Sequence, residues 1–305
     1  MESLSEFGAI LLMQGFNGLS VFSVLLLMAL GLALIFGQMG VINMAHGEFL
    51  AVGAYTTYLL ATLVQTYAPA FAPYYFLFAV VAAFVVAFAL GWLVEWAMIR
   101  HLYRRPLDTL LATWGLSLVM QQSLRSIFGP REVSPEMPEW LMGSWQPMEG
   151  VDIPINGLFV MALTFLMTAG LILALFRSTW GLHVRATVQN RAMSGAVGID
   201  TRRVDRVTFA LGCGIAGIAG AAFTTIGATG PTSGSLYIVD TFLTVVFGGA
   251  ASLLGTVASA FLIAQTQSVS EFFMTGSMAK VLTLTGIVII LMLRPQGLFS
   301  IKTRK

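Results

Sequence analysis

Three polar side chains, Asn43, His46 and Glu48, lie within a long apolar part of the sequence, because neither residues 7–45 nor residues 49–94 contain a charged residue. In hydrocarbon an unsatisfied backbone group costs several kcal/mol, so irregular chain there has to be buried in protein or line a wet cavity. Ionisable side chains at such a depth commonly mark the path of a substrate or an ion. We therefore expect these three residues, together with nearby Gln38, to line a path through a membrane.

A second interpretation of the same residues stays open at this point. In this interpretation they are ordinary interfacial residues at the cytoplasmic ends of two helices, which are joined by a turn at 37–47. A further candidate for the path is Asp240, an acid within an apolar region of the second half of the chain.

Residue types that perform catalysis or bind metal ions are not spaced as in a known catalytic or metal-binding motif. The three histidines at 46, 101 and 183 are scattered, unlike the ligands of a metal site. The sequence contains no GxxxxGK[ST] pattern, so it has no P-loop for nucleotide hydrolysis. Cys213 is the single cysteine and has no partner for a disulfide within the chain. We expect a protein that is not an enzyme, binds no metal ion or cofactor, and depends on another subunit for any ATP hydrolysis.

The composition indicates an all-α polytopic membrane protein. Of the 305 residues, 57% are hydrophobic and 10% are charged, and the mean hydropathy is +0.85. About 20 apolar residues cross a membrane as a helix, so the length allows roughly eight crossings in a single domain, 1–305, and leaves no room for a large soluble domain. The net charge of +2 does not indicate nucleic acid binding.

Eight segments have the length and apolarity of a membrane span. They are 9–36, 49–66, 74–99, 107–127, 156–176, 207–226, 253–270 and 279–293. The apolar segment 240–247 is too short to cross, at roughly 12 Å of helix. Gly212, Ala216 and Gly220 recur every four residues in the sixth span, a spacing that lets a neighbouring helix approach closely in lipid.

The charged loops predict the orientation. Of the 16 Lys and Arg residues, three lie in 100–105, six in 177–206 and four in 294–305. By the positive-inside rule these segments and the C-terminus are cytoplasmic, and the acidic loop 128–155 is periplasmic. Segment 240–270 must then enter and return, as a short half-helix, a glycine break and a full helix. Two interrupted hairpins, one in each half, indicate a transporter with internal pseudo-symmetry.

The arginine-rich segment 177–206 has the features of a coupling loop. Residues 184–193 can form a short helix, Gly195 and Gly198 break it, and Asp200 or Thr201 can cap the next helix. Such a helix could contact a cytoplasmic partner, although a basic loop without a partner explains the composition equally. The candidates for that contact are Arg185, Gln189, Asn190, Arg191, Ala192 and Gly198.

Four separated strings carry a resemblance to a known family. They are INMAHGE at 42–48, RRPLDTLLATWGLSLVMQQ at 104–122, VQNRAMSGAVGIDTRRVD at 188–205 and RPQGLF at 294–299. Together they resemble the permease subunits of the branched-chain amino acid ABC importers, from about residue 18 to residue 299. Within that family the chain looks most like the urea-importer permease.

The resemblance implies a multi-pass subunit of the bacterial inner membrane. Its expected partners are the lipid bilayer, a second homologous permease, two cytoplasmic ATPases that bind the ATP, and a periplasmic substrate-binding protein. It also implies that 185–199 is the segment that meets an ATPase. Ala192 and Gly198 match the Glu-Ala-Ala and Gly pattern of many ABC permeases only loosely, because the glutamate is missing.

Urea uptake is the function that we predict, with import of branched-chain or related amino acids as the alternative. A small neutral molecule needs only amide and hydroxyl groups along its path. An amino acid needs paired sites for its two charges, and most acids and bases within the apolar segments lie near the edges. Two other classes stay open: a passive channel or ion-coupled carrier without ATPases, and a structural or signalling membrane subunit.

Overall fold

The computed structural model describes residues 2–103, 105–148, 151–250 and 252–299. Arg104 and the basic tail Lys302, Arg304 and Lys305, which contribute to the predicted orientation, lie outside the described residues. So do the two ends of the predicted domain 1–305.

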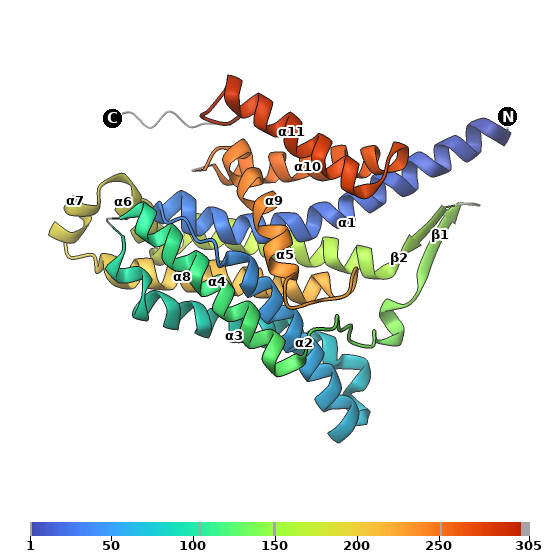
Figure 1. Ribbon diagram of the computed structural model, residues 1–305, viewed down its shortest axis with the longest axis horizontal. Coiled ribbons are helices and arrows are strands. Elements are labelled where there is room, and N and C mark those ends of the chain that lie inside the picture. Colours follow the sequence, from blue (N-terminus) through green and yellow to red (C-terminus); the bar gives the residue numbers. More distant parts are fainter. Residues whose placement is uncertain (1, 104, 149–150, 251, 300–305) are drawn as a thin grey trace.

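Within these ranges the chain forms eleven α-helices, two strands and three short 3-10 turns (Figure 1). The helices are α1 (Glu2–Met39), α2 (His46–Tyr67), α3 (Tyr75–Ala97), α4 (Pro106–Phe128), α5 (Ile155–Arg177), α6 (Thr179–Gln189), α7 (Arg191–Ala196), α8 (Thr201–Phe223), α9 (Ser233–Gly248), α10 (Leu253–Phe273) and α11 (Gly276–Leu293). The strands β1 (Ser144–Met148) and β2 (Val151–Pro154) pair antiparallel, and the 3-10 turns span Pro69–Tyr74, Ile99–His101 and Glu139–Leu141.

The helices confirm an all-α polytopic membrane protein. In the described part of the chain, six helices are long and apolar enough to cross a membrane: α1, α2, α3, α5, α8 and α11. Helices α4 and α10, with 23 and 21 residues, also have the length of a crossing. These eight correspond to the eight predicted spans. Helices α6 and α7 lie at one end of the bundle and the β1–β2 hairpin at the other (Figure 1), so the basic and acidic loops are on opposite sides, as predicted.

Helix α8 lies at the centre and packs mainly against α1, α2 and α3. Residues 208–210 and 212–223 are all buried. Small residues make this possible: a Cβ on Gly212 would lie 2.6 Å from the carbonyl oxygen of Gly31, and one on Gly220 would lie 2.0 Å from that of Leu50. The backbones therefore touch, and van der Waals packing between them replaces the hydrophobic effect, which is absent within lipid.

Two breaks in the helices meet inside the bundle. After α1, residues 40–45 form irregular chain, and Gly40 adopts a φ of +68°, a conformation that glycine adopts readily. After α8, residues 224–232 form turns before α9 begins. A Cβ on Gly47 would lie 2.1 Å from the carbonyl oxygen of Gly234, so the first turns of α2 and α9 are in backbone contact.

Two predicted boundaries were wrong. Helix α9 begins at Ser233, seven residues before Asp240, so the short helix predicted at 240–247 starts earlier than expected. Asp240 lies within this helix, and Lys280 Nζ is 2.8 Å from its carboxylate. The short helix predicted at 184–193 is divided at Asn190, whose side chain caps α7 by accepting a hydrogen bond from Met193 N at 3.0 Å. Asp200 caps α8, as predicted.

Replacement of Gly220 by alanine should destabilise the bundle, because the new methyl group would overlap the backbone of α2. Overpacking of this kind costs about 1–3 kcal/mol. The matched control is Gly115→Ala on α4, where nothing lies within 4 Å of the added Cβ; alanine there should stabilise the helix by roughly 0.5–1 kcal/mol. Thermal midpoints of the detergent-solubilised variants measure both effects. Equal midpoints for the two variants would contradict the close packing of α8.

Candidate functional site

A buried carboxylate marks the start of α2. Glu48 is fully buried, and its Oε1 accepts hydrogen bonds from Ser117 Oγ at 2.9 Å and from Gln121 Nε2 at 2.8 Å, both on α4. One turn earlier on α4, Thr113 Oγ1 accepts a hydrogen bond from Met44 N at 3.1 Å. The polar side of α4 therefore covers the break between α1 and α2.

The polar residues of α4 were not among the predicted site residues. Thr113, Ser117 and Gln121 are spaced four residues apart, which places them on one face of a helix. This spacing was the signal in the sequence that could have identified them. A stripe of hydroxyl and amide groups along an apolar helix requires a polar partner, and that partner is the N-terminal turn of α2.

His46 and Asn43 lie in the same break. His46 Nε2 is 3.2 Å from the carbonyl oxygen of Met28, which is 11 residues before the end of α1, or about 16 Å along a helix. Asn43 Oδ1 accepts a hydrogen bond from Ala45 N at 3.1 Å, and both side chains are buried. Both side chains are therefore enclosed by protein, and the choice between a path and an interfacial position stays a prediction.

The predicted path residues do not form one cluster. Asn43, His46 and Glu48 come together at the break, whereas Gln38 is half-buried near the end of α1. Asp240 is on α9 and pairs with Lys280 of α11. Lys280 was not among the predicted path residues. Whether any of these residues lines the path stays a prediction.

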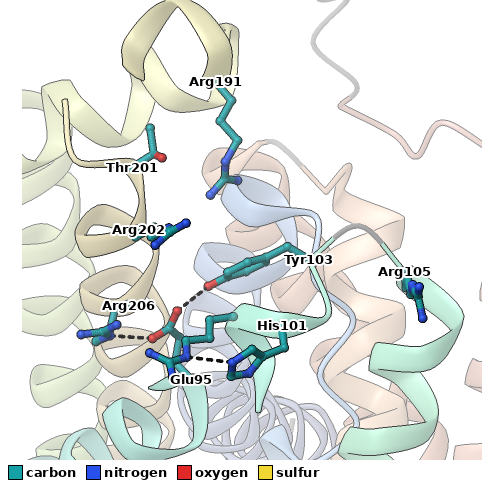
Figure 2. Close-up of a pocket in the computed structure, with 9 residues that line it drawn as sticks. Glu95, His101, Tyr103, Arg105, Arg191, Thr201, Arg202 and Arg206 are labelled. Atoms are coloured by element: carbon teal, nitrogen blue, oxygen red, sulfur yellow. Dashed lines mark hydrogen bonds and ion pairs between the residues drawn. The ribbon is translucent and has the colours of Figure 1, made fainter. Parts of the chain in front are cut away.

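A second polar region is a cleft of about 1060 Å³ at the end of the bundle that carries α6 and α7. Figure 2 shows Arg191, Arg202 and Arg206 of α7 and α8 on one side of it, opposite His101, Tyr103 and Arg105. The described residues that line the cleft include five arginines and one acid, Glu95. The cleft is therefore strongly basic and suits an anionic group.

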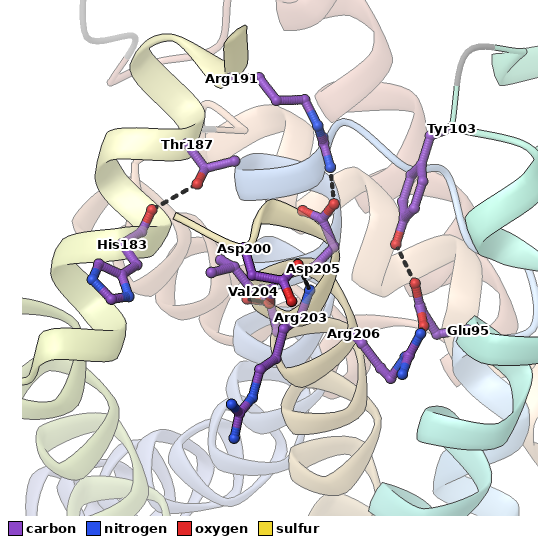
Figure 3. Close-up of polar contacts among 11 residues, drawn as sticks. Glu95, Tyr103, His183, Thr187, Arg191, Asp200, Arg203, Val204, Asp205 and Arg206 are labelled. Carbon is purple, nitrogen blue, oxygen red and sulfur yellow. Dashed lines mark hydrogen bonds and ion pairs between the residues drawn. The ribbon is translucent and has the colours of Figure 1, made fainter. Parts of the chain in front are cut away.

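Two buried acids hold this basic region together (Figure 3). Glu95 of α3 lies 2.7 Å from Arg206 Nε and accepts a hydrogen bond from the Tyr103 hydroxyl at 2.9 Å. Asp205 pairs with Arg191 and thereby connects α7 to α8. Burial raises the pKa of Tyr103 well above its usual range, and Glu95 raises it further, so the hydroxyl stays protonated and donates. The acids fix the arginines that surround them.

The predicted coupling residues are mostly exposed. Gln189, Asn190, Arg191, Ala192 and Gly198 are exposed, whereas Arg185 is half-buried, with its guanidinium 5.0 Å from the centre of the Phe176 ring. Their neighbours Met193 and Val197 are 61% and 69% exposed. Gly198 adopts a φ of +91° just beyond α7, a conformation that most side chains avoid. The segment thus presents apolar and basic side chains together.

These features define a class of protein. Helices α2 and α9 begin inside an apolar bundle, and buried polar side chains surround the start of α2. This arrangement is typical of transport proteins, whose irregular chain is tolerated only where protein or a cavity surrounds it. Among the described residues, no three His, Cys, Asp or Glu side chains are grouped as metal ligands would be.

The chain belongs to the family described as branched-chain amino acid transport system / permease component, whose model matches residues 15–293. Curated relatives include the high-affinity branched-chain amino acid transport system permease protein LivH of Salmonella typhimurium, 25% identical over 97% of this chain and 98% of the relative. BraD of Pseudomonas aeruginosa, with the same description, is 27% identical over 95% of both chains. LivH of Escherichia coli K12 is 25% identical over 97% of this chain and 98% of the relative. No solved structure matches the chain.

Membership of this family has two consequences. The chain is a permease component of a transport system, and therefore not an enzyme. The more specific likeness to a urea permease finds no support in these relatives, whose names specify branched-chain amino acids. The comparisons fit the alternative prediction better than the main one.

Glu48→Ala should loosen α4, because the substitution removes the acceptor for Ser117 and Gln121. A buried donor without a partner costs about 1–3 kcal/mol. Glu48→Gln is the matched control, since its Oε1 can still accept both hydrogen bonds, and we expect a change of less than about 1 kcal/mol. Thermal unfolding of the purified chain measures the difference. An equal loss in both variants would mean that the negative charge, and not the acceptor, stabilises the contact.

Proposed function

We propose that this chain is the membrane-spanning permease subunit of an ABC importer that carries branched-chain amino acids into a bacterial cell across the inner membrane. The observation that carries this proposal is the family match over residues 15–293, together with relatives of the same description that align along nearly the whole chain. The four strings of the sequence that resemble ABC permeases support the same class.

The contacts of Asp240 remove our main objection to an amino acid substrate. A zwitterion requires an acid and a base close together, and the acids and bases of the apolar segments seemed too near the edges. Lys280 Nζ, in the second turn of α11, lies 2.8 Å from Oδ2 of Asp240, which is in the middle of α9. Both charges are therefore present at one place, as an amino acid requires and as urea does not.

The exposed end of α6 and α7 is the surface that we assign to a cytoplasmic ATPase. Met193 and Val197 expose apolar side chains beside the basic cleft. Exposed apolar residues with a polar surround are typical of a protein interface. The complete importer then comprises two ATPases that bind ATP, a second homologous permease and a periplasmic binding protein at the opposite end, near the β1–β2 hairpin.

ATP-driven closure of the ATPases moves α6 and α7. The pairs Arg191–Asp205 and Arg206–Glu95 connect this segment to α8 and α3, the centre of the bundle. Because α8 is in backbone contact with α1 and α2, its displacement moves the two internal breaks, and the path opens alternately to each side.

Uptake by reconstituted proteoliposomes tests this function. The assembled importer, with its ATPases and binding protein, should take up radiolabelled L-leucine only when ATP is present, and should take up little urea. The same chain without ATPases should transport neither molecule. Transport by the chain without ATPases and without nucleotide would identify a channel or ion-coupled carrier. ATP-dependent uptake of urea, with no uptake of L-leucine, would support the urea interpretation.

A substitution at the tip of α7 tests the assignment of the ATPase surface. Met193→Asp places a charge in an apolar contact and should reduce co-purification of the ATPases by about tenfold or more, since a buried unpaired charge costs several kcal/mol. Met142→Asp is the matched control, because Met142 is 65% exposed in the loop at the opposite end. Membrane insertion of both variants should equal that of the parent. Unchanged co-purification with Met193→Asp would exclude this surface.

A further inference from the structure

A cavity of about 330 Å³ lies beside Asp240, apart from the break at α2 and from the basic cleft. It is enclosed by α1, α9, α10 and α11 and by the end of α8. Its size is at the lower end of the range of ~300–1,000 Å³ that is usual for small-molecule sites. One small molecule would fill it.

Two charged side chains of this cavity form an ion pair in which one carboxylate oxygen has no described hydrogen-bond donor. Lys280 Nζ lies 2.8 Å from Asp240 Oδ2 and donates a second hydrogen bond to the carbonyl oxygen of Leu236 at 3.2 Å. Asp240 is 8% exposed, yet its Oδ1 accepts no hydrogen bond from the residues that the structure describes. A buried carboxylate oxygen without a donor is costly, so a hydrogen-bond donor that approached the Asp240 carboxylate would be stabilised.

The pair has no evident value for stability. The desolvation of two charges in an apolar environment commonly exceeds their attraction, so an apolar pair of similar volume would hold α9 and α11 together as well. Ionisable groups that persist within membrane segments mark the sites of substrates and ions. The pair is therefore better explained by a ligand than by the fold.

The rest of the lining is mainly apolar. Val21, Val24 and Leu25 of α1 and Leu236 of α9 form aliphatic surface, and Phe223 and Tyr237 add aromatic rings. Gln267 and Glu271 of α10 are hydrogen-bonded to each other at 3.0 Å and complete the polar side. An acid, a base and an aliphatic wall thus lie around one small volume.

We propose that this cavity binds a branched-chain α-amino acid as a zwitterion, an inference that rests on the proposed function and names the substrate site. The ammonium group donates to the Asp240 carboxylate, the carboxylate of the ligand accepts from Lys280 Nζ, and the aliphatic side chain packs against Val24, Leu25 and Leu236. A neutral amide such as urea would leave both the charge pair and the aliphatic wall unused.

Protection of an introduced cysteine tests occupancy of the cavity. Leu236 lines the cavity and is 62% exposed, whereas Cys213, the single native cysteine, is fully buried. In the assembled importer with Leu236→Cys, L-leucine should slow maleimide labelling at position 236 at least threefold. Leucinamide, which lacks the carboxylate, and 4-methylpentanoate, which lacks the ammonium, should not slow it at the same concentration. Equal protection by all three compounds, or by none, would overturn the proposal.

Uptake by a charge-neutral variant provides the second test. Asp240→Asn with Lys280→Met removes both charges without leaving one unpaired, so the bundle should keep its thermal midpoint within a few degrees. Its half-saturating concentration of L-leucine for uptake should rise about tenfold or more, because charged hydrogen bonds contribute about 1.5–3 kcal/mol. Arg125→Gln, which removes an exposed charge near the end of α4, is the control and should leave uptake unchanged.

The outcomes separate the site from the function. If the wild-type importer takes up leucine and the charge-neutral variant does so with the same half-saturating concentration, this site is wrong while the proposed function stands. If the wild-type importer takes up no branched-chain amino acid, the proposed function itself fails.

Discussion

The close approach of α8 to α1, α2 and α3 is the constraint on which the rest of the structure depends. Glycine at 212, 217 and 220 brings backbone against backbone, and this contact leaves no room for a Cβ. Because the helices are so close, the irregular chain at 40–45 and 224–232 is enclosed by protein and not by lipid. Helices α2 and α9 can therefore begin inside the bundle, where Gly47 meets Gly234.

The buried acids differ in the groups that they contact. Glu95 and Asp205 each pair with an arginine at the basic end, and these pairs connect helices. Glu48 accepts hydrogen bonds only from neutral groups among the described residues, and Asp240 shares its lysine with a carbonyl oxygen. Glu95 and Asp205 pair with arginine and Asp240 pairs with lysine, whereas Glu48 has no cationic partner among the described residues.

Much of the fold could be predicted from composition and spacing, because spans of about 20 apolar residues and basic loops follow from the physics of the bilayer. The eight spans could be predicted in this way, and so could the placement of the basic and acidic loops at opposite ends of the bundle. The ion pair of Asp240 could not be predicted, since its partner Lys280 is 40 residues after it in the sequence. The partners of Glu48 were missed for the same reason: only the tertiary packing of α4 identifies which polar stripe faces which acid.

The length of α1 has a consequence for the lipid around the protein. Its apolar part, Ile10–Met39, has 30 residues, or about 45 Å of helix, against ~30 Å of hydrocarbon in a typical bilayer. Such an excess is accommodated by tilting the helix or by locally thickening the bilayer, at fractions of a kcal/mol per Å of mismatch. Acyl-chain length therefore bears on the inclination of α1, and through the Gly31–Gly212 contact on how α1 packs against α8.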